Sequence, residues 1–295
     1  YKLQHRGGKG VIATTTREED IVKDIFIASA HSYILFFTNK GKVHWLKVYN
    51  VPEASRQAMG KAIVNLLELG SNEAVTALVP VKNFDGGHYL SMATKKGIVK
   101  KTELMAYSNP RRHGIAAIAL DGKDELIGVE MTDGAQQIIL ATKNGLAGRF
   151  DEKNVRATGR SSQGVRGISL KENDGVIGMV IAPVTASDEK TLLSVTENGY
   201  GKRTPINDYR LINRGGSGVI NIQCSERNGG VVAVCPVTDN DEIIFISKNG
   251  IIIRVPAGDI SVIGRNTQGV RIMKLEANDK VVSAVRVVRD GNNGQ

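Results

Sequence analysis

The chain has 295 residues, and its 39 lysines and arginines against 30 aspartates and glutamates give a formal net charge of +9 at pH 7. This excess indicates a polyanionic partner, with nucleic acid as the first candidate. No apolar run approaches the ~18 residues of a membrane helix and no leader opens the chain, so we expect a soluble cytoplasmic protein with no membrane contact. Cys224 and Cys235 have neither zinc-site spacing nor a disulfide framework, and we expect them to be buried, reduced thiols.

The chain begins at Tyr1 rather than at a methionine, so we expect it to be part of a longer protein. Its first recognisable element is a basic glycine turn at residues 4–10, which reads Gln-His-Arg-Gly-Gly-Lys-Gly. The glycines allow the backbone to approach a phosphate group closely, and Arg6 and Lys9 add full positive charges. Such turns are common, so this motif alone is weak evidence for a phosphate site.

Related basic turns follow at regular intervals along the chain. They occupy residues 56–60, 111–114, 160–164, 214–218 and 265–269. The last glycines of the six turns lie at positions 10, 60, 114, 164, 218 and 269, which are 50, 54, 50, 54 and 51 residues apart. A period of about 52 residues predicts six structural repeats within a single domain that spans residues 1–295.

Each repeat contains signals for four short strands and no convincing helical pattern. A first apolar stretch follows the turn, as in residues 63–67 and 168–170. Second strands are expected at residues 74–79, 126–131, 176–181 and 231–234. A third strand ends in Thr or Ser and enters a hairpin, and a fourth strand leaves it, as in residues 98–102 and 251–255. Four short strands per repeat predict an all-β, propeller-like ring of four-stranded blades.

The hairpins share the pattern Thr/Ser-x-x-Gly, and their glycines are Gly41, Gly97, Gly145, Gly199 and Gly250. Because both residues of Asn-Gly tolerate positive φ, we expect type I′ turns at the hairpins that contain this pair. Six basic turns therefore stand against five hairpins. Either the ring closes with residues outside this chain, or one blade is incomplete. The first turn has no preceding hairpin, so we expect it at the seam where the ring closes.

Positive charge recurs beside both landmarks, and rotating one blade onto the next would repeat it around a rim. The predicted rim residues are Lys40, Lys42, Arg56, Lys61, Lys95, Lys96, Lys100, Lys101, Arg111, Arg112, Lys143, Arg149, Arg160, Arg166, Lys202, Arg203, Arg214, Lys248, Arg254, Arg265 and Arg271. Exposed edge strands also tolerate lysine and arginine because these residues discourage aggregation. For a single residue the two interpretations are equally good, but the repetition favours a binding surface.

No catalytic or metal-binding pattern accompanies this charge. The five histidines fall at unrelated points of the repeat, and the acidic residues cluster in turns such as residues 18–20 and 239–241. Gly216-Ser217-Gly218 lacks the complete nucleophile-elbow pattern. We therefore expect no catalytic residue, no metal site and no cofactor in this domain.

Duplex DNA is the nucleic acid that the composition favours. Aromatic residues make up only 5% of the chain and Trp45 is the sole tryptophan, so a platform for stacking single-stranded bases is not expected. Cations along a curved rim would neutralise phosphates and bend the duplex. Smooth bending by 40–90° costs on the order of 1–6 kcal/mol, which several phosphate contacts can offset.

These motifs resemble the C-terminal domain of the DNA gyrase A subunit, whose characteristic box reads Gln-Arg-Arg-Gly-Gly-Arg/Lys-Gly. Residues 4–10 match the box at every position except His5. Residues 198–204 and 264–270 and the turns at family spacing extend the resemblance over essentially all 295 residues.

The resemblance implies a six-bladed β-pinwheel, in which blades exchange strands and the rim wraps duplex DNA. The box residues that it implicates in DNA binding are Gln4, His5, Arg6, Gly7, Gly8, Lys9 and Gly10. His5 is largely neutral at pH 7, so one contact charge is lost there. The resemblance also implies a non-catalytic part of an enzyme that introduces negative supercoils by directional strand passage. Its partners would be the remainder of the gyrase A chain and the gyrase B chain in an A2B2 assembly associated with the nucleoid, with ATP and Mg used by other parts of the enzyme and the isolated domain monomeric.

Three other interpretations remain at this point. The equivalent domain of topoisomerase IV often has fewer blades and a degraded box, whereas this chain has six turns and a nearly intact box. A protein-interaction propeller would use the basic rim to dock acidic partners, but the Gly-His and Trp-Asp signatures of the commonest such repeats are absent from the sequence. An enzyme built on a propeller is disfavoured because the sequence offers no repeated carboxylate set.

Overall fold

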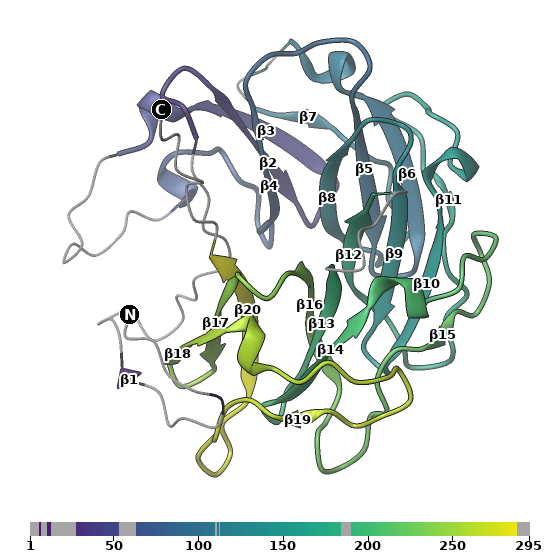
Figure 1. Ribbon diagram of the computed structural model, residues 1–295. Helices are drawn as coiled ribbons and strands as arrows, with labels where there is room; N and C mark the ends of the chain where they lie inside the picture. Colours follow the sequence, from purple (N-terminus) through teal and green to yellow (C-terminus); the bar gives the residue numbers. More distant parts are fainter. Residues whose placement is uncertain are drawn as a thin grey trace, which may run out of the picture.

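The computed structural model describes residues 6, 11–12, 28–52, 63–109, 111, 113–183 and 190–287. These residues form five antiparallel sheets of four strands each, arranged as blades of a β-propeller (Figure 1). The all-β class and the ring of four-stranded blades are therefore confirmed. Five blades lie within the described residues, against the six expected with one incomplete.

The blades are numbered 1 to 5 in chain order, and each is given from its inner to its outer strand. Blade 1 contains β4 (Val75–Val81), β2 (Tyr33–Thr38), β3 (Lys42–Lys47) and β7 (Ile115–Ala116). Blade 2 contains β8 (Leu126–Thr132), β5 (Tyr89–Thr94), β6 (Ile98–Glu103) and β11 (Val165–Arg166). Blade 3 contains β12 (Val176–Ala182), β9 (Gln137–Thr142), β10 (Leu146–Asp151) and β15 (Val219–Ile220).

Blade 4 contains β16 (Val231–Val237), β13 (Thr191–Thr196), β14 (Tyr200–Pro205) and β19 (Val270–Arg271). Blade 5 contains β20 (Val281–Val287), β17 (Glu242–Ser247), β18 (Ile251–Pro256) and β1 (Val11–Ile12). Six short 3-10 helices complete the described elements: η1 (Val48–Asn50), η2 (Ile63–Asn65), η3 (Leu104–Tyr107), η4 (Glu152–Asn154), η5 (Ile206–Asp208) and η6 (Ala257–Asp259). None of the helices in this part of the chain is long and apolar enough to cross a membrane.

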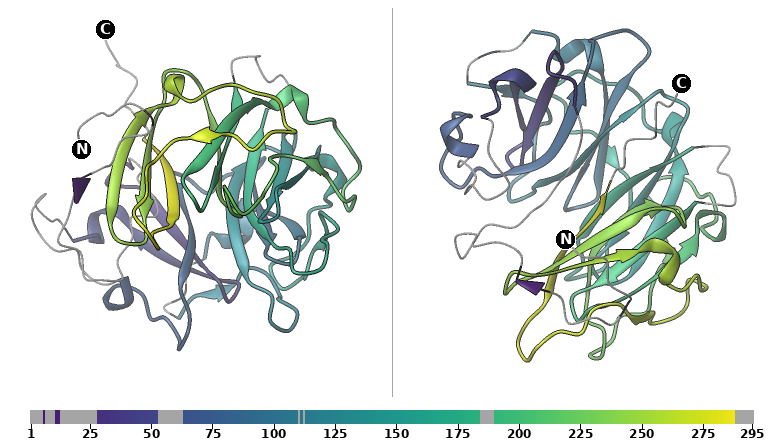
Figure 2. Two further views of the ribbon diagram at one scale, coloured as in Figure 1. Left: turned by 90° about the horizontal axis from the view of Figure 1, so that it is seen from below. Right: turned by 60° about the vertical axis from the view of Figure 1, so that its left-hand side comes forward.

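The outer strand of each blade comes from a neighbouring repeat. β7 follows the hairpin of blade 2 in the sequence but pairs with β3 of blade 1. In the same way, β11, β15 and β19 follow the hairpins of blades 3, 4 and 5 but pair with β6, β10 and β14 of blades 2, 3 and 4. At the other end of the chain, β1 pairs with β18, with Val11 opposite Ile252 (Figure 2). The strand that follows the first basic turn in the sequence is therefore the outer strand of blade 5, whereas the turn itself, expected at the seam of the ring, lies outside the described residues except for Arg6.

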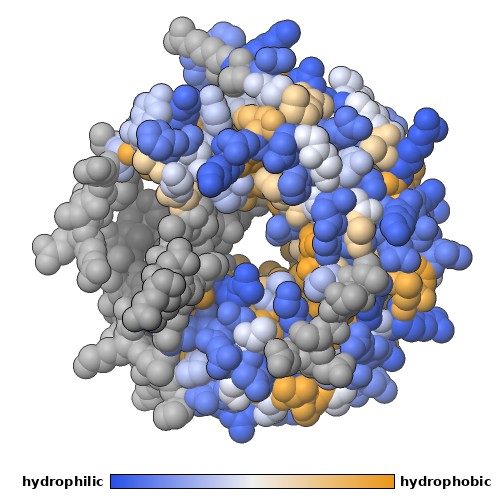
Figure 3. Space-filling view, turned by 45° about the horizontal axis from the view of Figure 1, so that its top comes forward, coloured by the Kyte–Doolittle hydropathy of each residue, from blue (hydrophilic) through white to orange (hydrophobic). Residues whose placement is uncertain are grey.

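The hydrophobic core lies in layers between neighbouring blades. One layer joins Leu35 and Phe37 of blade 1 to Leu90 and Met92 of blade 2, and equivalent layers follow between each later pair of blades. Burial of each such side chain stabilises the fold by about 1.5–3 kcal/mol. The inner strands β4, β8, β12, β16 and β20 contact one another in that order and lie toward the centre of the ring in Figure 1. Figure 3 shows an opening near this centre.

The expected hairpins are present, but their turn type differs from the prediction. Each hairpin glycine donates its N–H to the carbonyl of the Thr or Ser three residues earlier, as in Gly145 to Thr142 at 3.1 Å. The φ angles of the five glycines lie between 73° and 85°, whereas the residues before them, asparagine in three hairpins and lysine in two, keep negative φ. A turn with negative φ at both central residues, followed by a left-handed glycine, is a type I turn with a G1 bulge rather than type I′.

The carbonyl of the hairpin glycine explains the choice of turn. In blades 1 to 4 it accepts two N–H groups from the repeat that supplies the outer strand, as Gly145 does from Asn221 at 2.8 Å and Ile222 at 3.2 Å. We call this pair of hydrogen bonds the latch. The stretches that were expected as first strands adopt other conformations. Ile168 donates to Gly97 and is buried between blades 2 and 3 instead of extending a ladder, and residues 63–65 form the 3-10 helix η2.

The two cysteines are free thiols, as expected, but both are half-buried rather than fully buried. Cys235 lies on the inner strand β16, and burial raises the pKa of its thiol to about 12. Burial likewise raises the pKa of the Cys224 thiol. Both thiols are therefore protonated near neutral pH.

Candidate nucleic-acid interface

The basic glycine turns are joined to one another along the outer edge of the ring. The residue five positions after one turn glycine donates its N–H to a carbonyl in the next turn. This bond recurs three times, from Ala119 to Ser162 at 3.0 Å, from Ser169 to Gly216 at 2.9 Å and from Gln223 to Thr267 at 2.8 Å. The described turns and the outer strands β7, β11, β15 and β19 therefore form a continuous edge along blades 1 to 4, on the outside of the ring in Figure 1.

Three arginines of these turns are fixed by hydrogen bonds to neighbouring segments of the ring. Arg214 donates to the carbonyls of Asn154 at 2.8 Å and Arg166 at 3.2 Å. Arg265 donates to the equivalent carbonyl of Ile220 at 2.9 Å, and Arg6 donates to the hydroxyl of Ser261 at 2.9 Å. A guanidinium group has five N–H donors, so these bonds orient the side chain without exhausting its capacity to bind an anion.

Two buried lysines hold the backbone of two turns from beneath. The Nζ atom of Lys100 lies 2.6 Å from the carbonyl oxygen of Ala117 and 2.5 Å from that of Arg160. In the same way, Nζ of Lys202 lies 2.6 Å from the carbonyl oxygen of Gly264 and 2.8 Å from that of Arg265. Both lysines are the third residue after a hairpin glycine. Burial, with Arg160 or Arg265 nearby, lowers the pKa of each ammonium group to about 8.

The next residue along the same strands connects each blade to its neighbour. Lys101 Nζ donates to the carbonyl of Glu152 at 3.2 Å. Arg149 donates to the carbonyls of Ile206 and Tyr209 at 2.8 and 3.0 Å, and Arg203 donates to that of Ile260 at 2.8 Å. In blade 1 the equivalent residue is Trp45, whose indole N–H donates to Tyr107 at 2.9 Å. These side chains therefore link each blade to the next by hydrogen bonds, and we call them struts.

The predicted rim residues consequently fall into four groups. Those that are exposed are Lys40, Lys42, Lys95, Lys96, Arg111, Lys143, Arg166, Arg214, Lys248 and Arg271. Those that are half-buried are Arg160, Arg254 and Arg265. The expected solvent exposure is wrong for Lys100, Lys101, Arg149, Lys202 and Arg203, which are buried because their charges reach backbone carbonyls of the next repeat.

The fourth group lies outside the described residues and comprises Arg56, Lys61 and Arg112. The same holds for most of the box, namely Gln4, His5, Gly7, Gly8, Lys9 and Gly10. Arg6 is exposed, and through Ser261 it is attached to blade 5.

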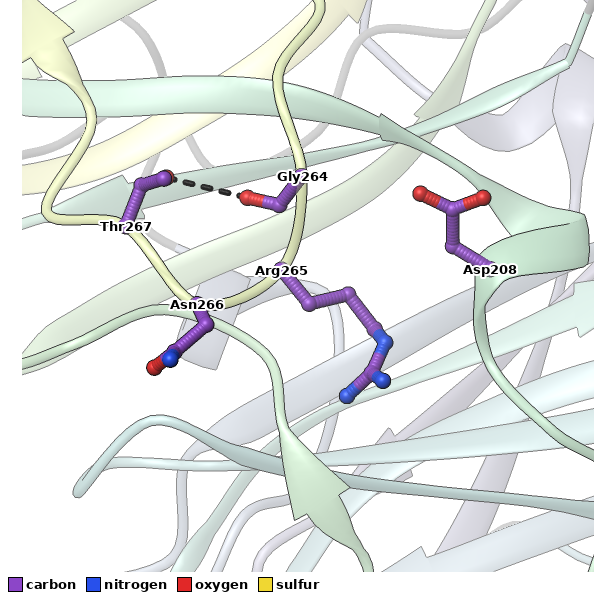
Figure 4. Close-up of a pocket in the computed structure, with 5 residues that line it drawn as sticks. All are labelled: Asp208, Gly264, Arg265, Asn266 and Thr267. Atoms are coloured by element: carbon purple, nitrogen blue, oxygen red, sulfur yellow. Dashed lines mark hydrogen bonds between the residues drawn. The ribbon is translucent and has the colours of Figure 1, made fainter.

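Shallow hollows flank the last basic turn. One of about 400 Å³ is lined by Asp208 and by the turn residues 264–267, where the hydroxyl of Thr267 donates to Gly264 at 3.0 Å (Figure 4). Another of about 430 Å³ lies on the side of the preceding turn and shares Arg265 and Asn266 with the first. The turn therefore projects between two depressions, with Arg265 bordering both.

One arginine that the repeat pattern missed also lies at this edge. Arg227 is exposed, and its guanidinium carbon lies 4.9 Å from the centre of the Tyr200 ring. Because its loop differs from the loops of the other repeats, no periodic signal in the sequence could have identified it. Within the described parts of the chain, no group of three or more His, Cys, Asp and Glu side chains could hold a metal ion.

The ring of blades with exchanged outer strands and a continuous arginine-bearing edge defines a strand-exchanging β-propeller. The family described as "DNA gyrase C-terminal domain, beta-propeller" matches residues 1–29, 32–82, 88–133, 136–183, 190–237 and 241–287. These six segments correspond to the six repeats, and the chain belongs to this family.

Curated relatives agree with this assignment. The DNA gyrase A subunit of Haloquadratum walsbyi is 46% identical over 287 residues, which are 96% of this chain and 33% of that protein. The DNA gyrase A subunit of Staphylococcus aureus strain NCTC 8325 is 44% identical over 291 residues, which are 98% of this chain and 32% of that protein. The chain therefore spans about a third of the length of these relatives.

Two solved structures are similar over most of the chain. "Structure of DNA gyrase A C-terminal domain" superposes with a TM-score of 0.81 and 29% identity, covering 98% of this chain and 93% of that one. "Crystal structure of the C-terminal domain of DNA topoisomerase IV" superposes with a TM-score of 0.79 and 27% identity, covering 88% and 80%. The C-terminal domains of DNA gyrase A and of topoisomerase IV thus both share this fold, so the fold does not distinguish between them.

Proposed function

We propose that this chain is a single non-catalytic domain that binds duplex DNA along its outer edge and bends the duplex around the ring. The edge of glycine turns carries the proposal, because Arg6, Arg214 and Arg265 each lie four residues before a turn glycine and are hydrogen-bonded to the outer part of the ring. Guanidinium groups at such points can follow the phosphates of a curved duplex without reading its sequence. The coloured part of the circumference in Figure 3 is mainly hydrophilic, and DNA would cover this surface.

In the longer protein, bending would present one segment of the DNA for directional strand passage, leading to negative supercoiling. We infer that the parent enzyme is a gyrase with A2B2 composition, located in the cytoplasm and at the nucleoid. Cleavage, ATP and Mg would then belong to other parts of that enzyme, and this domain would need no cofactor and be monomeric in isolation. Support comes from the relatives named as the DNA gyrase A subunit, which are 44–46% identical to this chain.

The domain of topoisomerase IV remains the second candidate because its fold is nearly as similar, with a TM-score of 0.79 against 0.81. The box at residues 4–10 favours gyrase. A domain of topoisomerase IV would depend little on this box, so the contribution of Arg6 and Lys9 to DNA bending separates the two candidates.

Removal of both box cations should weaken DNA binding more than removal of two hairpin lysines. We expect Arg6→Ala with Lys9→Ala to lower the affinity for linear duplex DNA further than Lys143→Ala with Lys248→Ala, although each pair removes two positive charges. The logarithm of the association constant, measured by fluorescence anisotropy, should fall linearly with the logarithm of the salt concentration, with a slope of about −0.9 per phosphate contacted. Equal losses in the two double variants would reduce the box to one cation pair among many, and absence of duplex binding at low salt would contradict the proposed function.

A further inference from the structure

The loop before β16 in blade 4 differs from the equivalent loops of three other blades. In those blades a buried or half-buried aspartate two residues before the inner strand accepts an N–H from the hairpin of its own blade. The three bonds run from Lys96 to Asp124 at 2.9 Å, from Asn144 to Asp174 at 3.0 Å and from Asn249 to Asp279 at 3.1 Å. In blade 4 the hairpin N–H of Asn198 goes instead to the backbone carbonyl of Asn228, at 3.1 Å. Blade 4 therefore has a neutral acceptor where these three blades have a carboxylate.

Hydrogen bonds fix this loop against both the hairpin and the last basic turn. The side-chain amide of buried Asn228 donates to the carbonyls of Gln223 at 2.8 Å and Gln268 at 3.1 Å. The amide of Asn198 donates to the carbonyls of Glu226 and Arg227, each at 3.1 Å. The backbone at Arg227 is thus anchored on two sides, and this anchoring determines where its side chain begins.

Arg227 and Arg271 converge on one tyrosine. Their guanidinium carbons lie 4.9 and 5.5 Å from the centre of the Tyr200 ring. Arg271 is also the cross-strand partner of Tyr200, and its NH2 donates to the phenol oxygen at 2.9 Å. Together the two arginines lower the pKa of the Tyr200 phenol, as expected for an aromatic ring beside two cations.

The charge of this pair is not neutralised within the described part of the molecule. Both arginines are exposed whereas Tyr200 is buried, and none of the ion pairs among the described residues includes either guanidinium group. Two like charges held close together create a local maximum of positive potential. A planar guanidinium group matches the oxygens of a phosphate, and stacking on an aromatic ring orients it in advance.

We propose that Arg227 and Arg271, oriented by Tyr200, form a phosphate-binding site for the backbone of duplex DNA at the outer edge of blade 4. The inference rests on the proposed function and adds to it a specific anchor that the repeat pattern lacks. Arg271 lies on the outer strand β19 and Arg227 on a loop bonded to the turn before that strand. The site is therefore continuous with the outer edge along which the duplex would run.

The test compares two double variants of the 295-residue chain with equal loss of charge. Arg227→Ala with Arg271→Ala removes the proposed site, and Lys82→Ala with Arg286→Ala removes two exposed cations at the inner strands β4 and β20. We expect the first pair to reduce duplex affinity on the order of tenfold or more at ~0.15 M salt and to lower the salt slope by about 2. The second pair should change affinity by no more than about twofold, because charges distant from the duplex are screened.

Tyr200 gives a further arm of the same experiment. Tyr200→Phe keeps the ring, whereas Tyr200→Leu removes it and should cost part of the affinity lost in the arginine pair. Equal affinity losses in the two double variants would overturn the site. An arginine pair that affected binding of a polyglutamate peptide but not of duplex DNA would overturn it in favour of an acidic protein partner. If the unaltered chain bound no duplex at all, the proposed function would fail instead, so the two failures are distinguishable.

Discussion

At the scale of single residues, Lys100 and Lys202 show how position in a repeat changes the role of a charge. Both read in the sequence as surface cations, yet each ammonium group is enclosed and donates to two carbonyls of a basic turn or the segment after it. The burying surface comes from a segment about 60 residues later in the chain. Local sequence cannot report this burial, which is why it was not predicted.

The lowered pKa of Lys202 predicts a specific pH dependence of stability. Its folded-state pKa of about 8 lies below the ordinary value of 10.5, so between these values the unfolded state holds more protons and the free energy of unfolding rises with pH. Urea unfolding at pH 7.5 and 9.5 should show wild type gaining stability relative to Lys202→Met over this interval. Exposed Lys274→Met is the control and should keep the wild-type pH dependence. If the free energy of unfolding changed equally with pH in wild type and in Lys202→Met, the lowered pKa of Lys202 would be contradicted.

At the scale of elements, the hairpins combine a local signal with a long-range one. The Thr/Ser-x-x-Gly pattern predicted five hairpins and the strands on either side of them, all of which are present. The turn type was mispredicted because the Asn-Gly preference is local, whereas the glycine is placed by contact with another repeat. A Cβ at Gly145 would lie 2.1 Å from the carbonyl oxygen of Ile222, so only glycine fits there.

Alanine substitution separates this contact from backbone strain alone. Gly145 and Gly87 have φ of +85° and +91°, but a Cβ at Gly87 would meet nothing within 4 Å. Positive φ by itself should cost about 1–2 kcal/mol in either variant. We expect Gly145→Ala to lower the free energy of unfolding by at least about 1 kcal/mol more than Gly87→Ala, because the backbone carbonyl of Ile222 cannot move without breaking the latch. Equal destabilisation in urea titrations would show that the latch contributes nothing.

At the scale of the whole molecule, exchanged strands and struts make the ring a chain of mutually dependent blades. The period of about 52 residues was enough to predict the ring and its repeated edge. It could not distinguish cations that face solvent from cations that join blades, because both occur at the same interval. Arg149 and Arg203 belong to the second kind, while Arg214 and Arg265 remain on the edge and also hold that edge together.

Non-periodic features are the remaining gap between sequence and site. Arg227 is found only once the loop before β16 is seen bonded to the hairpin and to the last turn. Its partner Arg271 was predicted as a rim residue from the repeat, but the ring of Tyr200 that they share was not. Sites of this kind depend on three segments meeting at one point, which spacing along a single chain does not encode.

The central claim is that the outer edge bends duplex DNA, and ligase-mediated circularisation of a fragment of about 150 bp, one persistence length, measures this directly. If the claim is correct, the 295-residue chain should increase the yield of closed circles at low salt, and the increase should disappear as salt weakens the phosphate contacts. The double variant Arg6→Ala with Lys9→Ala should produce fewer circles than wild type at equal occupancy of the DNA. Saturating binding of the duplex with no increase in circles would contradict the claim.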